Sequence, residues 1–119
     1  MKTFNIFKNL SNIIRQRGTR GLGSISPNSS MTIHIPSSHY GLIILHGVYT
    51  SLTAIIEAYV NSNGTSYARV MAVSETAQTR DFAITTSTNT ITIANNHTSG
   101  YITSVQFISN KADDISVGG

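Results

Sequence analysis

The chain has 119 residues, of which 39% are hydrophobic and only 11% are charged, and it contains no cysteine. An average soluble domain carries about 25% charged residues, so hydroxyl and amide groups must solvate most of this surface. Length and composition fit one globular domain and exclude a disulfide framework and a thiolate metal site.

The net charge of +3 is distributed unevenly along the chain. Five of the eight basic residues lie in the first twenty positions, and the first acid is Glu57. From residue 21 onward, three basic residues stand against five acids, a net charge of −2 (3 − 5). Nucleic-acid binding requires basic residues interleaved with aromatic residues on the domain itself, so this acidic body indicates no nucleic-acid partner.

Residues 1–20 are predicted to form a basic N-terminal arm. Phe7, Leu10 and Ile14 follow the i, i+3, i+7 spacing of a short amphipathic helix. Polar residues interrupt every apolar stretch, so neither a secretory signal nor a membrane span is predicted. So short a helix is marginal alone, and we expect it to dock on a partner; a nucleic-acid or membrane contact and a frayed terminus are the alternatives. The residues assigned to attachment are Phe4, Phe7, Leu10, Ile14, Arg15, Arg17 and Arg20.

Glycine and serine mark residues 21–30 as a linker, and a period of two begins at Met31. Turn residues separate the alternating runs at intervals typical of an all-β, antiparallel β-sandwich or jelly-roll-like domain over residues 31–110. Residues 111–119 are predicted to be a C-terminal tail. The seven expected strands are 31–35, 40–49, 52–60, 67–73, 81–85, 90–94 and 101–108.

One of these strands and one turn carry further information. Leu42, Ile43, Ile44 and Leu45 are apolar on both faces, which indicates a strand that is central in a sandwich or shared with another subunit. We therefore predict an oligomer interface there, in a homotrimer. Asn63-Gly64 is the strongest hairpin signal in the chain, because both residue types tolerate positive φ.

The search for catalytic chemistry gives no site. The four histidines do not have the spacing of a zinc site, so no metal or other cofactor is predicted. A glycosidase requires two opposed carboxylates, and Glu57 with Glu75 is the one pair available. A solvated carboxylate, or one paired with Arg69 or Arg80, is the better interpretation, so the chain is expected to be non-enzymatic.

Two polar loops, Asn61–Ser66 and Asn95–Gly100, are the richest in Asn, Ser and Thr, and loops on rigid β-scaffolds carry binding functions. Each loop adjoins a tyrosine whose ring has the shape to stack on a sugar, while the amides bind its hydroxyls. Ordinary turns beside packing tyrosines are the alternative. The residues assigned to ligand binding are Asn63, Tyr67, Asn96, His97 and Tyr101.

Four segments carry a resemblance to a known family: Ser30–Pro36 (SMTIHIP), Tyr40–Leu45 (YGLIIL), Thr90–Asn95 (TITIAN) and Val105–Ile108 (VQFI). Together they resemble the small terminal β-sandwich of bacteriophage tail-fibre and receptor-binding proteins, over about residues 24–110. The resemblance implies a trimeric virion protein that contacts other virion proteins and a host-surface glycan or protein. It departs from that family in having an arm in place of a long fibrous shaft, so we expect either a fragment or a small separate virion protein. A lectin-like carbohydrate-binding module of cellular origin is the alternative function, and a small glycosidase is a third.

Overall fold

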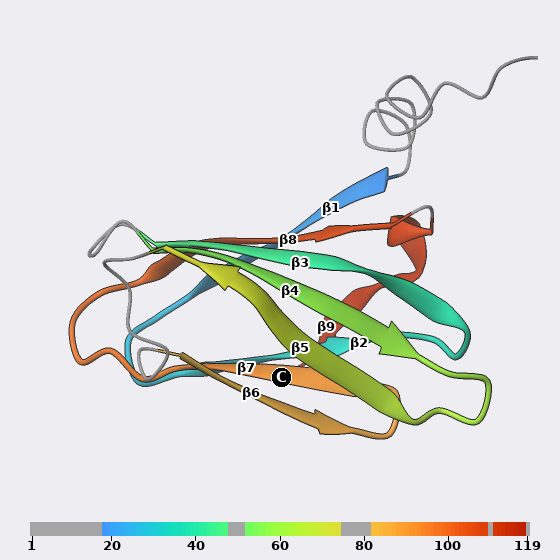
Figure 1. The fold of residues 1–119 in the computed structure, drawn as a ribbon. Helices are drawn as coiled ribbons and strands as arrows, with labels where there is room; N and C mark the ends of the chain where they lie inside the picture. Colours follow the sequence, from blue (N-terminus) through green and yellow to red (C-terminus); the bar gives the residue numbers. More distant parts are fainter. Residues whose placement is uncertain (1–17, 48–51, 75–81, 110, 119) are drawn as a thin grey trace, which may run out of the picture.

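The computed structural model describes residues 18–47, 52–74, 82–109 and 111–118. These residues form two antiparallel sheets that lie in two layers (Figure 1). One sheet has five strands in the order β1-β8-β3-β4-β5, and the other has four in the order β6-β7-β2-β9. The predicted all-β, antiparallel class is confirmed. The strands are β1 (Thr19–Ile25), β2 (Ser30–His34), β3 (His39–Gly47), β4 (Thr53–Val60), β5 (Ser66–Val73), β6 (Phe82–Ser87), β7 (Thr90–Asn95), β8 (Ile102–Ile108) and β9 (Ser116–Gly118).

Two strands form where the sequence predicted a linker and a tail. Residues 21–25 belong to β1, which pairs with β8 at the edge of the five-stranded sheet. The pairing register shifts on both sides of Gly23, so this edge strand accommodates its glycines at irregularities in the ladder. Near the C-terminus, a 3-10 helix (Ala112–Asp114) leads into β9, which pairs with β2. The predicted linker is therefore wrong for residues 21–25 and the predicted tail for residues 112–118.

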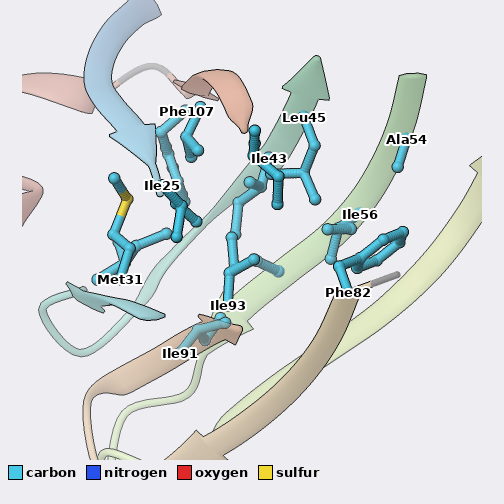
Figure 2. Packing of buried hydrophobic residues seen from close by; sticks show 14 of the residues in the cluster. Ile25, Met31, Ile43, Leu45, Ala54, Ile56, Phe82, Ile91, Ile93 and Phe107 are labelled. Atoms are coloured by element: carbon cyan, nitrogen blue, oxygen red, sulfur yellow. The ribbon is translucent and has the colours of Figure 1, made fainter. Parts of the chain in front are cut away.

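A single hydrophobic core fills the space between the layers. In β4 every second residue is buried, from Ala54 through Ile56 and Ala58 to Val60, and this alternation turns the intervening residues outward. Figure 2 shows side chains of this core from both sheets, among them Ile43 of β3 and Ile93 of β7. Full burial of each large aliphatic side chain contributes roughly 1.5–3 kcal/mol.

The Asn63-Gly64 hairpin forms between β4 and β5 as predicted. Gly64 has a φ of +90°, and the Oδ1 atom of Asn61 accepts hydrogen bonds from the backbone N–H groups of Asn63 and Thr65 at 3.2 and 3.0 Å. This turn fixes the register in which Tyr59 faces Tyr67.

The apolar run Leu42–Leu45 lies in β3, a central strand between β8 and β4. Ile43 and Leu45 are fully buried in the core, whereas Leu42 and Ile44 are half-buried on the opposite face. The predicted oligomer interface is therefore wrong for Ile43 and Leu45, because the strand alternation commits both to the domain's own core. Leu42 and Ile44 stay available for a contact between subunits.

The predicted helix of the N-terminal arm lies outside the described residues, as do all of the attachment residues except Arg20. Arg20 is exposed in β1. Within the described ranges, no helix has the length and apolar character needed to cross a membrane.

Candidate binding surface on the five-stranded sheet

The outward-facing sides of the two sheets differ in chemistry. On the four-stranded sheet, Thr32, Thr92 and Thr85 form a row across β2, β7 and β6, and the hydroxyl oxygens of Thr32 and Thr92 lie 3.2 Å apart. On the five-stranded sheet the outward positions include four aliphatic residues among tyrosines and polar residues, and no described strand lies over them. We call the half-buried residues Leu42, Ile44, Ile55 and Ile108 the apolar patch.

The strand pairing makes the apolar patch continuous. Ile108 of β8 faces Leu42 of β3, and Ile44 of β3 faces Ile55 of β4, so the four side chains occupy two adjacent rows. Directly opposite residues in antiparallel strands have Cβ atoms about 5 Å apart, close enough for their side chains to touch. The outer face of the five-stranded sheet therefore presents one apolar area and not scattered single residues.

A row of tyrosines extends the same face toward the β4–β5 hairpin. Tyr40, Tyr59 and Tyr67 are paired in register across β3, β4 and β5, with exposed fractions of 66, 42 and 44%. The rings of Tyr59 and Tyr67 stack with centroids 4.7 Å apart and planes 16° from parallel. Exposed, ordered aromatic side chains of this kind are typical of binding surfaces.

An ion pair lies one step along the strands from the stacked rings. The Nη2 atom of Arg69 donates to the Oε1 atom of Glu57 at 2.9 Å, as the sequence interpretation of Glu57 expected. Both side chains are half or more exposed, so the pair adds little stability. Between the ion pair and the rings lies a depression of about 330 Å³, which we call the tyrosine trough; its lining residues are Glu57, Tyr59, Tyr67, Ala68 and Arg69.

The two loops predicted to bind ligand lie at opposite ends of the domain (Figure 1). The carbonyl of Gly64 accepts a hydrogen bond from Asn89, in the turn that precedes β7, whereas the carbonyl of His97, just beyond β7, accepts one from Asn28. The whole of β7 separates the two contacts. The structure therefore does not bring the two predicted groups together in one site.

Within these loops, the polar side chains mainly form hydrogen bonds with the backbone of the same loop. The Oδ1 atom of Asn63 accepts from the backbone N–H and the hydroxyl of Thr65 at 3.1 and 2.8 Å. The Nδ1 atom of His97 accepts from the N–H groups of Ser99 and Gly100 at 3.1 and 2.8 Å. These hydrogen bonds occupy atoms that the ligand prediction assigned to a sugar.

The other predicted residues are placed differently. Asn96 is exposed, and Tyr101 is 52% exposed at the loop end remote from the tyrosine trough. Tyr67 is the one predicted ligand residue that lines the trough.

A histidine–aspartate contact lies apart from this surface. The Nε2 atom of His39 is 3.0 Å from the Oδ2 atom of Asp114, and its Nδ1 atom is 3.0 Å from the carbonyl oxygen of Ser37. Only 9% of His39 is exposed, so the contact ties the start of β3 to the 3-10 helix. In the part of the chain that the structure describes, no three His, Asp or Glu residues are grouped to hold a metal ion.

Sequence reasoning missed Tyr40, Tyr59 and the trough as a unit. The Asn63-Gly64 signal pointed to the hairpin but not to its register. A two-residue loop at these positions would set Tyr59 opposite Ala68, whereas the five-residue loop 61–65 sets Tyr59 opposite Tyr67 and Glu57 opposite Arg69. Tyr40 had no such local signal, because its place beside Tyr59 depends on the separate pairing of β3 with β4.

No protein-family model, curated protein or solved structure matches this chain.

Proposed function

We propose that this chain is a non-enzymatic assembly and attachment protein that associates with copies of itself through the apolar patch. One observation carries the proposal: the outer face of the four-stranded sheet carries threonine, serine, alanine and His34 in its paired rows, whereas Leu42, Ile44 and Ile55 stand at central positions of the other outer face. Cross-strand aliphatic pairs stabilise a sheet modestly, but a contiguous exposed apolar area on one face only supports a protein partner there.

The size of the face limits such a contact. Five strands about 4.8 Å apart, with about seven residues each rising about 3.3 Å, give a face of roughly 20 by 23 Å, or about 460 Å². Specific interfaces bury about 800 Å² on each partner, so this face alone supplies a little over half of the usual area. A stable contact centred on the apolar patch therefore also needs surface beyond the sheet face.

Resemblance to the terminal β-sandwich of tail-fibre and receptor-binding proteins supports the remaining parts of the proposal. It favours a virion location, a trimer, and docking to other virion proteins through the basic arm. The two-layered, all-β architecture agrees with that type of domain.

The test compares two lysine substitutions at matched positions. Ile44→Lys and Thr92→Lys each place a charge on the outer face of a central strand, one on each sheet. Light scattering coupled to size exclusion should show an oligomer for the parent and for Thr92→Lys, and a monomer for Ile44→Lys, because an interface does not tolerate an unpaired buried charge. Circular dichroism confirms that both variants fold. A monomeric parent at micromolar concentration would refute self-association. Leu45→Lys is unsuitable, since Leu45 belongs to the core.

A further inference from the structure

The stacked tyrosines leave one aromatic face free at the edge of the sheet. The 4.7 Å between the ring centroids equals the usual spacing of neighbouring strands, so Tyr59 covers one face of Tyr67. β5 is the outermost of the described strands on that side, and no described strand lies beyond the other face of Tyr67. Tyr67 thus offers a rigid apolar platform held in place by its neighbour.

Hydrogen-bond donors and acceptors lie next to the Tyr67 ring. Arg69 has five N–H donors and Glu57 has about four acceptor positions, and the 2.9 Å contact between them uses one of each. Two residues along a strand correspond to about 6.7 Å, which separates the ion pair from the tyrosine row. The free face of Tyr67 lies at the open edge of β5, and Arg69, on the same strand, is the polar group that borders both this face and the tyrosine trough.

This combination matches a sugar ring. A pyranose has an apolar C–H face that stacks on an aromatic ring, and vicinal hydroxyls that each donate and accept hydrogen bonds. We propose that the tyrosine trough binds a neutral hexopyranose unit of a glycan, a function that goes beyond self-association. A neutral sugar fits better than an acidic sugar or a phosphate, because Glu57 already neutralises Arg69 and its carboxylate would repel an anion.

The test titrates the full-length protein with maltohexaose, cellohexaose and a galactan hexasaccharide, and with oligogalacturonate as the acidic comparison. Backbone amide chemical shifts are followed by NMR. At least one neutral oligosaccharide should shift signals in β4 and β5 at concentrations up to about 10 mM. Tyr67→Ala should weaken that association about tenfold, as expected for loss of one stacking contact.

Tyr101→Ala is the matched control, because Tyr101 is similarly exposed but lies at the opposite end of the domain. It should bind as the parent does. If Tyr101→Ala loses binding and Tyr67→Ala retains it, the site is the loop after β7 and the proposal is wrong. The proposal also fails if none of the three neutral sugars shifts the β4 and β5 signals.

A charge-changing variant tests the chemistry of the trough. Glu57→Gln keeps the shape and hydrogen bonding of the side chain but leaves Arg69 with an uncompensated charge. This variant should gain binding of oligogalacturonate, because it removes the carboxylate that repels an anion. Tighter binding of oligogalacturonate than of neutral sugars by the parent would overturn the assignment. Failure here is distinct from failure of self-association, because Tyr67→Ala should keep the parent's mass and Ile44→Lys should keep sugar binding.

Discussion

Replacing Asn95 with alanine should destabilise the domain more than any other single amide substitution in its loops. Asn95 ends β7, and only 2% of it is exposed. Its Nδ2 atom donates to the carbonyl oxygens of Ile25 and Gly100 at 3.0 and 2.9 Å, and its Oδ1 atom accepts from the N–H of His97 at 3.0 Å. One buried side chain therefore connects the end of β1, the end of β7 and the loop that leads to β8.

The magnitude follows from the number of buried partners. Each of these three hydrogen bonds contributes about 1 kcal/mol net, a longer fourth one to the Ser26 carbonyl adds less, and leaving buried carbonyl groups without a donor adds to the loss. We expect Asn95→Ala to lower the free energy of unfolding by about 3 kcal/mol. For a body of this size, that corresponds to a melting temperature lower by roughly 12 °C. Asn95→Asp should cost more, because a carboxylate oxygen would face the same carbonyl oxygens.

The assay is thermal and urea unfolding followed by circular dichroism, at one fixed protein concentration because association raises apparent stability. Asn96→Ala is the matched control: Asn96 is the next residue and is exposed, so its replacement should change stability by less than about 0.5 kcal/mol. Equal effects of the two substitutions would refute the role assigned to the Asn95 hydrogen bonds.

Two further outcomes are expected from the fold. Gly41→Ala should destabilise the domain by about 2 kcal/mol in the same unfolding assay, because a Cβ at this position would lie 2.7 Å from Phe107 Cε1 in the packed β3–β8 contact. Gly21→Ala is the control: its Cβ would meet nothing within 4 Å, so the substitution should be nearly neutral. Deletion of residues 1–17 should leave the melting temperature of the body nearly unchanged, since β1 starts only at Thr19. Under the proposed function, the deletion should also abolish attachment to other virion proteins. A deletion mutant that fails to fold would show that the arm belongs to the core.

Local pattern predicted much of the fold because alternation and turn chemistry act over short distances. The alternation from Met31 marked β2, and the Asn63-Gly64 turn marked both strands of its hairpin. The register of that hairpin did not follow from the turn, because its loop spans residues 61–65 and not Asn63-Gly64 alone. All five residues of the tyrosine trough lie within residues 57–69, but their pairing depends on that loop length.

The two terminal edge strands could not be predicted in the same way. β1 contains three glycines or serines among its seven residues and shows no clean alternation, and β9 has only three residues. Each becomes a strand because a neighbour, β8 or β2, offers unpaired backbone groups. The loop after β7 and the Asn61–Ser66 loop have similar compositions but lie at opposite ends of the domain. Composition alone could therefore not predict their positions, which depend on how all the strands are connected.

Strand β3 shows why an apolar run alone does not reveal which of its two faces packs into the core. Alternation separates Leu42 and Ile44 from Ile43 and Leu45, but both pairs are apolar, so the sequence of β3 does not say which pair faces the core. The neighbours decide it: Ile43 faces Phe107 and Leu45 faces Ala54, all buried, whereas Leu42 faces the charged Glu57. Once the core has taken Ile43 and Leu45, Leu42 and Ile44 exceed what the domain needs for its own folding. Their excess apolar surface is the physical reason to look for a second copy of the chain on this face.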